Sequence, residues 1–246
     1  MELPTYIALS RLSAQQRALD VTASNIANSS TPGFKASRVL FSDWLSSQTG
    51  TDSPQGDRRV AFTQDRATYR EQQSGTIQHT SNTFDFALSG DGYFTVSTPR
   101  GPRLTRAGHF TPQANGTIGD MEGNALLDAA GRPLRLAPTD TEVTVTADGT
   151  VSTPLGTIGR IGVVTPSDPN RLTPEGSRDL RADVPTAPVA QPQIVQGAVE
   201  DSNVQPIVET TKMMNDVRSF EFTSEFIKSE ADRMQSAIDK ITQRTA

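Results

Sequence analysis

The chain has 246 residues, with 23 Lys and Arg against 28 Asp and Glu, which gives a formal net charge of −5 at pH 7. This mild acidity disfavours a role built on nucleic-acid phosphate contacts. The sequence has no Cys and only two His, so disulfides, thiolate catalysis and a three-His metal centre are excluded. Only 34% of the residues are hydrophobic, which suggests that some apolar surface is buried only against partners.

The first residues carry no basic region followed by an apolar run, so we expect no cleaved secretory signal. Residues 5–31 contain neither Gly nor Pro and predict a long helix. A seam with alternating steps of four and three, the spacing of a coiled coil, runs through Thr5, Leu9, Leu12, Gln16, Leu19, Ala23 and Ile26. Its larger apolar members are Leu9, Leu12, Leu19 and Ile26. A turn is predicted next, at Thr31-Pro32-Gly33-Phe34, with Pro second, Gly third and Phe34 as the anchor.

Residues 37–74 predict an extended or irregular connecting segment, because 46–56 are rich in Ser, Thr, Gly and Asp. Basic and aromatic side chains alternate in its second half. They are Arg58, Arg59, Phe62, Arg66, Tyr69 and Arg70. Nucleic-acid binding is one interpretation of this stretch. The acidic net charge favours a solvated strand or a subunit contact instead.

Residues 75–182 predict one compact all-β domain. Thirteen of the 18 Gly lie between Gly75 and Gly162, among short runs in which apolar and polar residues alternate. Three dipeptides typical of hairpin turns separate such runs: Asp91-Gly92, Asn115-Gly116 and Asp148-Gly149. Residues 183–199 contain Pro185, Pro188 and Pro192 and predict a Pro-rich linker.

Residues 207–246 again lack Gly and Pro and predict a C-terminal helix about 60 Å long, within the segment 200–246. Ser202 or Asn203 is expected to cap it, with Pro206 in the first turn. A nine-member seam repeats with steps of four and three. Its members are Met213, Val217, Phe220, Ser224, Ile227, Ala231, Met234, Ile238 and Ile241. Phe222 and Phe226 lie off this seam and indicate a second contact surface.

Together these elements predict an α+β fold. Long helices from residues 1–36 and 200–246 form a coiled-coil-like inner domain, and a central all-β domain lies between them in the sequence. A helix that packs on its own domain usually has a wider apolar face than these narrow seams. The predicted C-terminal helix is also longer than a small domain is wide. We therefore expect the two seams to pack on each other and the off-seam groups to contact neighbouring chains.

Few residues suggest catalysis or ligand binding. His79 and His109 lie in strand-like or polar stretches that indicate structural or surface roles. A calcium site at Asp120, Glu122 and Asp128 is one interpretation, but their spacing fits no EF-hand and acidic residues are common in turns. A glycosidase pair at Asp85 and Asp91 is another, but Asp85 lies in an alternating strand-like run and Asp91 in a predicted hairpin turn. We expect no catalytic residue, cofactor, metal or small-molecule substrate.

Four segments resemble, in the same order, motifs of bacterial flagellar rod and hook proteins. The first two are 24–36 (SNIANSSTPGFKA) and 86–94 (FALSGDGYF). The third is 104–110 (LTRAGHF) with the following Asn115-Gly116, and the fourth is 197–204 (GAVEDSNV), continued by Met213-Met214 and 218–221 (RSFE). Within this family, the short length and the first 45 residues resemble proximal-rod more than distal-rod members. Phe220 stands where many relatives have Tyr.

The resemblance implies a structural subunit of the flagellar basal-body rod, which crosses the periplasm and transmits torque for motility. Its partners would be copies of itself, other rod proteins in a helical assembly, and the flagellar type III export apparatus. Neither nucleic acid nor membrane insertion is expected. The alternative is a secreted β-rich binding module whose helices form a self-contained oligomerisation stalk, and a wall-degrading hydrolase ranks third. The predicted assembly interface comprises Leu9, Leu12, Leu19, Asn25, Ile26, Asn28 and Phe34, together with Met213, Val217, Phe220, Phe222, Phe226, Ile227, Met234, Ile238 and Ile241.

Overall fold

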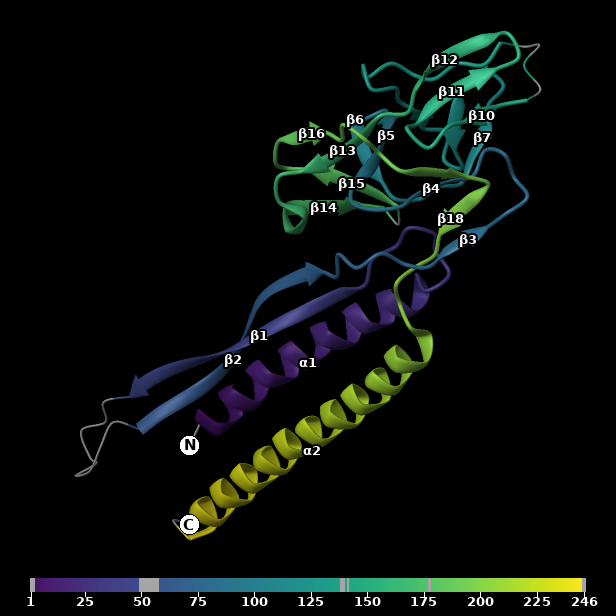
Figure 1. The fold of residues 1–246 in the computed structure, drawn as a ribbon. Coiled ribbons are helices and arrows are strands. Elements are labelled where there is room, and N and C mark those ends of the chain that lie inside the picture. The colour runs from purple at the N-terminus through teal and green to yellow at the C-terminus, as the bar shows by residue number, and fades with distance from the viewer. Residues whose placement is uncertain (1–2, 49–57, 138–139, 141, 177, 245–246) are drawn as a thin grey trace. The chain divides into compact units, whose positions relative to one another are not determined.

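A computed structural model describes residues 3–48, 58–137, 140, 142–176 and 178–244. The chain divides into two compact units. The helical unit comprises residues 1–26, 37–69 and 205–246, and the β unit comprises 27–36 and 70–204. Helices confined to the two ends and antiparallel sheets between them confirm the predicted α+β class (Figure 1).

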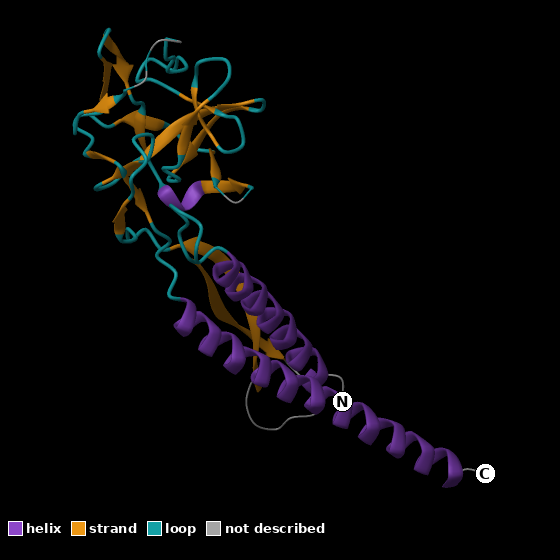
Figure 2. Ribbon diagram, turned by 90° about the vertical axis from the view of Figure 1, so that its right-hand side faces the viewer, coloured by secondary structure: helices purple, strands orange, loops and turns teal. Residues whose placement is uncertain are grey.

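The helical unit contains two helices and a two-stranded ribbon. Helix α1 spans Leu3–Ala27 and α2 spans Pro206–Arg244; strands β1 (Ser37–Gln48) and β2 (Arg58–Arg70) pair with each other. The two helices run in opposite directions, and the ribbon follows α1 (Figures 1 and 2). Residues 37–74, expected to form an extended or irregular connection, therefore include two long paired strands. No two-residue turn signal joins them in the sequence, so the hairpin could not be inferred from its turn.

The β unit is built on one large antiparallel sheet with the strand order β14-β15-β6-β5-β9-β8-β7, to which β13 and β16 are joined through β5. These strands are β5 (Tyr93–Thr98), β6 (Gly101–Thr105), β7 (Phe110–Pro112), β8 (Ile118–Asp120), β9 (Ala125–Leu126), β13 (Val163–Pro166), β14 (Leu172–Glu175), β15 (Asp179–Ala182) and β16 (Thr186–Pro188). A short 3₁₀ turn, Pro169–Arg171, precedes β14.

Smaller sheets complete the β unit. Strands β10 (Thr144–Val145), β11 (Thr150–Thr153) and β12 (Gly156–Arg160) form one sheet, and β17 (Ile194–Gln196) pairs with β4 (Phe86–Leu88). Strand β18 (Ala198–Glu200) pairs with β3 (Ile77–His79). Residues 183–199, expected to be a linker, therefore contribute β16, β17 and most of β18. Their prolines do not prevent this pairing, since Pro188 lies on an edge strand paired only with β13.

Two of the three predicted hairpins are confirmed. Asn115-Gly116 connects the paired strands β7 and β8, and Asp148-Gly149 connects β10 and β11. The prediction at Asp91-Gly92 is wrong, because the flanking strands β4 and β5 belong to different sheets. Gly92 nevertheless has a φ of +131°, which is strained for residues with a side chain, so the dipeptide still forms a turn.

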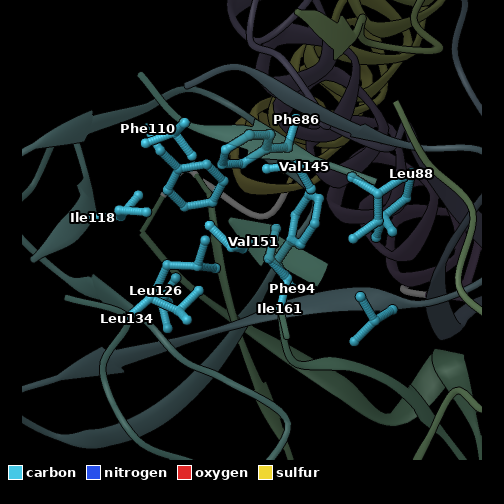
Figure 3. Packing of buried hydrophobic residues seen from close by; sticks show 14 residues of the cluster. Phe86, Leu88, Phe94, Phe110, Ile118, Leu126, Leu134, Val145, Val151 and Ile161 are labelled. Atoms are coloured by element: carbon cyan, nitrogen blue, oxygen red, sulfur yellow. The ribbon is translucent and has the colours of Figure 1, made fainter. Parts of the chain in front are cut away.

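The core of the β unit is organised around three fully buried phenylalanines from different strands (Figure 3). The Phe94 ring meets the edge of Phe110 with centroids 5.7 Å apart, and Phe86 lies 5.8 Å from Phe110. Ile118, Leu126, Val151 and Ile161 pack around them. Because β4, β5, β7, β8, β9 and β11 all contribute, this core unites the sheets into one body.

The carboxyl group of Asp179 gives the β unit a distinctive pH dependence. Burial, reinforced by the charges of Asp120 and Glu122, raises its pKa to about 6 from 3.8. The folded state therefore favours the protonated acid, so its stabilising contribution is present below pH 4 and is lost as the pH rises through 6. Asp179→Asn should raise the unfolding free energy at pH 7 by roughly 1 kcal/mol after allowance for solvent screening, and have little effect at pH 4.

Thermal unfolding of both chains at the two pH values measures this difference. Asp183→Asn is the matched control, since hydrogen bonds from Arg181 and Thr173 lower the pKa of the Asp183 carboxyl. It should be neutral or destabilising at pH 7. A stabilising effect of both substitutions, or of neither, would contradict the assignment.

Candidate assembly site on the terminal helices

The C-terminal end of α1 is fixed by the side chain of Asn25, which is fully buried. Its Oδ1 accepts from the Ser37 backbone N–H and its Nδ2 donates to the Ser37 carbonyl, both at 2.9 Å. The same Nδ2 donates to Oε2 of Glu209 at 3.3 Å, and Arg38 donates to the other Glu209 oxygen at 2.5 Å. One amide thus joins α1, the start of β1 and the first turn of α2. Asn25, predicted to contact other chains, is buried within its own.

The turn after α1 is confirmed and belongs to the β unit. The Phe34 N–H donates to the Thr31 carbonyl at 3.2 Å, and Gly33 has a φ of +73°. A Cβ at Gly33 would lie 2.3 Å from the carbonyl carbon of Arg106, so only Gly fits here. Phe34 is half-buried, as an anchor of this turn would be.

The carboxylate of Glu200 lies at the centre of a buried group of charges, which we call the Glu200 cluster: Glu200, Lys35 and Arg106. Lys35 Nζ donates to Oε1 at 2.5 Å and Arg106 Nε donates to Oε2 at 2.7 Å. The backbone N–H of Gly75 also reaches Oε1, at 2.9 Å. Burial lowers the pKa of Lys35, which the Glu200 carboxylate opposes. Two cations therefore depend on one acid for their charge compensation.

Arg106 extends this cluster into the 86–94 motif. Its guanidinium donates to the carbonyls of Gly92 and Gly90, at 2.5 and 2.8 Å, and lies over the Tyr93 ring at 5.9 Å from the centroid. The turn at Gly90–Gly92 is thus an acceptor site for an arginine from the neighbouring 104–110 motif. All four quoted motifs meet at this guanidinium and its Glu200 partner, since Lys35 of the first motif also binds Glu200.

Asn203 has a different role from the predicted helix cap. Its Oδ1 accepts from the Ala36 N–H at 2.7 Å, and its Nδ2 donates to the carbonyls of Glu71 and Gln73. Ser202 accepts from Val204 instead. Helix α2 begins at Pro206, where the Gln205 carbonyl accepts from the Glu209 N–H at 3.0 Å. The cap prediction is wrong because the helix starts later and Asn203 joins non-strand segments of the β unit.

The covered face of α2 overlaps the predicted seam at Met213, Val217, Phe220, Ile227 and Met234. Its buried and half-buried side chains include a series with steps of four and three: Glu209, Met213, Asp216, Phe220, Thr223, Ile227, Glu230 and Met234. Every second member is polar, and these polar members, spaced by seven residues, form what we call the polar heptad: Glu209, Asp216, Thr223 and Glu230. The predicted seam positions Ser224 and Ala231 are exposed, so the covered face is displaced toward the polar heptad.

The helical unit also leaves polar atoms unsatisfied. Within the described chain, Oε1 of Gln15, Oγ1 of Thr22 and Oδ2 of Asp216 are buried without a hydrogen-bond partner. Each such atom carries a desolvation cost of about 1–3 kcal/mol. These faces of α1 and α2 are therefore not complementary to the rest of the single chain.

The predicted interface residues fall into three classes of exposure. Asn25 is buried; Leu9, Phe222, Phe226, Ile238 and Ile241 are exposed; and the remainder are half-buried, namely Leu12, Leu19, Ile26, Asn28, Phe34, Met213, Val217, Phe220, Ile227 and Met234. Phe222 has 74% of its surface exposed, a large value for a phenylalanine.

Since α2 has 39 residues and α1 has 25, the last turns of α2 extend about 20 Å beyond the length that α1 could cover.

The other candidate residues have local structural roles. His109 Nδ1 lies 2.8 Å from the buried Asp85 carboxylate, which also accepts from Thr80 and Asn82, while His79 is exposed on β3. Asp120 and Asp128 each accept backbone N–H groups of their own turns. Among the described residues no cluster of His and acids could hold a metal, and no helix is long and apolar enough to span a membrane. Of the basic stretch, the Arg58, Arg59, Phe62 and Arg66 side chains lie outside the described part.

Glu200, Lys35, Arg106 and Glu209 were not identified as site residues from the sequence. The sequence did offer one indication of these residues, since three of the quoted motifs carry a charged residue next to small or apolar ones. They are Lys35 in 24–36, Arg106 in 104–110 and Glu200 in 197–204. Such charges are buried only when paired, so finding them in separate motifs indicates that the motifs meet. Glu209 carries no comparable signal in the helix sequence.

Glu200→Gln should strongly destabilise the β unit, because it removes the charge that compensates Lys35 and Arg106. Breaking a buried ion pair on one side costs about 3–5 kcal/mol. Urea unfolding of the full chain, followed through amide resonances of β5, measures the change. Glu225→Gln, at an exposed position on α2, is the control and should leave the midpoint unchanged. Equal stability of the two variants would show that the cluster contributes little.

Comparison with known proteins places these features in a family. Three family models match: flagella basal body rod protein over residues 6–35, flagellar hook protein FlgE/F/G D1 domain over 87–153, and flagellar basal body rod FlgEFG protein C-terminal over 195–240. The flagellar basal-body rod protein FlgF of Mesorhizobium japonicum is 36% identical, with 97% of each chain covered. FlgF of Caulobacter vibrioides is 34% identical, with 98% of each covered.

FlgG of Bacillus subtilis is 33% identical, with 95% of this chain and 97% of the relative covered. These relatives are structural proteins, which confirms the prediction that the chain is not an enzyme. The matched regions contain residues that make the internal contacts of each unit. They are Asn25 and Glu209 in the helical unit, and Gly33, Lys35, Arg106 and Glu200 in the β unit. On this similarity over nearly the whole length, the chain belongs to the family of flagellar basal-body rod proteins.

Proposed function

We propose that the chain is a structural subunit of the flagellar basal-body rod that assembles through the faces of α1 and α2. The observation that carries this proposal is the incompleteness of the helical unit. Phe222 and Phe226 are exposed off the covered face, and Ile238 and Ile241 are exposed near the end of α2. A single chain gains little by presenting these side chains to water. Helices from neighbouring subunits would bury them.

The assembly is heterologous and helical, since a face of one subunit contacts a different face of the next. The half-buried residues Leu19 and Ile227 belong to the coiled-coil-like packing of the two helices, as the heptad spacing predicts. The off-seam residues Phe222 and Phe226 contact a neighbour. Many such repeated contacts resist twisting, which is what transmission of torque requires.

The similarity to FlgF over nearly the full length supports a place in the proximal rod. Export through the flagellar type III apparatus is the route that the resemblance to rod proteins implies. Copies of this chain and the other rod proteins are its partners. The β unit, whose core is complete in one chain, provides a stable body from which the helices act.

Phe222→Asp tests the proposal most cleanly, because a residue 74% exposed contributes little to the fold of the isolated chain. A charge buried without a partner costs several kcal/mol, so incorporation into basal bodies should fall at least about 100-fold and motility should be lost. Gln235→Asp, also exposed on α2 but outside both helix series and off the Phe222 face, is the matched control and should assemble normally. Quantification of the subunit in purified basal bodies, alongside motility, measures the effect.

Leu19→Asp and Ile227→Asp should likewise block assembly while the β unit keeps its melting temperature. Normal motility in all three Asp variants would refute assembly through the helices. If the isolated wild-type chain sediments as a stable small oligomer, the self-contained stalk becomes the better explanation of the exposed faces. A monomer is the expected result.

A further inference from the structure

A small cavity in the β unit is lined by more positive charge than the chain neutralises. Its volume is about 50 Å³, and its wall includes Lys35, Arg70, Arg106 and Arg178 beside the Tyr93 ring. Every lining residue lies in 27–36 or 70–204, so the cavity belongs to the β unit alone. Glu200 compensates Lys35 and Arg106. Glu200 forms no ion pair with the other two arginines, Arg70 and Arg178, among the described residues.

The side chain of Arg178 has an unsatisfied donor. Its Nε atom is buried, and no hydrogen-bond acceptor reaches it within the described chain. An N–H buried without an acceptor destabilises the fold, and more so when the group is charged. Native proteins seldom retain such a group unless water, an ion or another molecule supplies the acceptor.

Arg70 is in a similar position at the end of β2. No ion pair or side-chain hydrogen bond is found for its guanidinium among the described residues, and burial lowers its pKa. The phenol of Tyr93 is the group that acts against this effect. Arg70 is half-buried, and a cation partly removed from water is stabilised by a nearby negative charge.

Asp179 also lines the cavity but does not neutralise these arginines. Its Oδ2 lies 3.5 Å from the Asn124 amide, and the arginines that lower its pKa are Arg103 and Arg100. That pKa is nevertheless raised, which is the opposite of what an ion pair with Arg70 or Arg178 would produce.

We infer that this cavity is a binding site for one oxyanion, a carboxylate, and that Arg70 and Arg178 hold it. A space of about 50 Å³ admits a carboxylate but excludes a nucleotide or a sugar. A guanidinium binds a carboxylate through paired N–H donors, which Arg178 has to spare. The carboxylate comes from an Asp or Glu side chain of an adjacent rod subunit, a source that rests on the proposed function. With 28 acidic residues per chain, a second copy supplies such groups in abundance.

The first experiment tests the site independently of assembly. Sodium acetate is titrated into the isolated full-length chain against sodium chloride at equal ionic strength, and the arginine Nε–H resonances are followed by NMR. Acetate should shift the Arg70 and Arg178 signals in a saturable way and raise the melting temperature. Arg178→Gln should abolish the shift at Arg70, whereas the control Arg171→Gln, an exposed arginine, should retain it. Absence of a saturable shift in the wild-type chain would overturn the proposal.

The melting temperature without acetate separates a binding role from a structural one. Arg178→Gln should leave it unchanged or raise it, because the substitution removes a buried donor that has no acceptor. A lower melting temperature would show that Arg178 stabilises the fold through a contact of its own, and would contradict the proposal.

The second experiment identifies the source of the carboxylate. Incorporation of Arg178→Gln into basal bodies should fall at least tenfold relative to Arg171→Gln. Normal incorporation, with acetate binding intact in the wild type, would mean that the cavity takes a free anion and would refute the subunit contact. If the wild-type chain itself failed to enter basal bodies, the proposed function would fail while the acetate result would stand.

Discussion

The buried carboxylate of Glu200 is the interaction on which the β unit depends. It compensates Lys35 from the turn after α1 and Arg106 from the segment after β6. Arg106 in turn organises the Gly90–Gly92 turn, and the Glu200 carbonyl accepts from Gly33 at 2.7 Å. Because a buried ion pair is costly when one partner is missing, these segments must be brought together at the same time. The cluster thus selects one arrangement of segments that are far apart in the sequence.

The two units differ in how completely a single chain satisfies them. The β unit closes an apolar core around Phe86, Phe94 and Phe110, whereas the helical unit buries the polar heptad and exposes phenylalanines. Such a division suits a subunit whose helices complete their packing only in an assembly. A covered face with a polar residue every seven positions is weak by itself, since polar groups at such positions trade stability for specificity. Neighbouring subunits can then complete the packing.

Local signals in the sequence predicted the elements better than their partners. The absence of Gly and Pro located both helices, and Asn115-Gly116 and Asp148-Gly149 located true hairpins because turn chemistry is local. Asp91-Gly92 carried the same signal, but the strands beside it pair elsewhere. The 3.5-residue spacing identified the correct helix, yet the covered face includes Asp216 and Thr223, since burial on a long helix is decided by what lies beside it. The Glu200 cluster was missed because ion pairs between distant segments leave no spacing pattern.

The central claim is that the terminal helices complete their packing only in the assembled rod. Amide hydrogen exchange of the full chain, compared before and after incorporation into basal bodies, measures this most directly. The account predicts fast exchange at residues 1–26 and 205–246 in the free chain relative to the β unit, and slow exchange there after assembly, because ordering the helices requires surfaces that neighbours supply. Slow exchange at both ends of the free chain, unchanged on assembly, would contradict it.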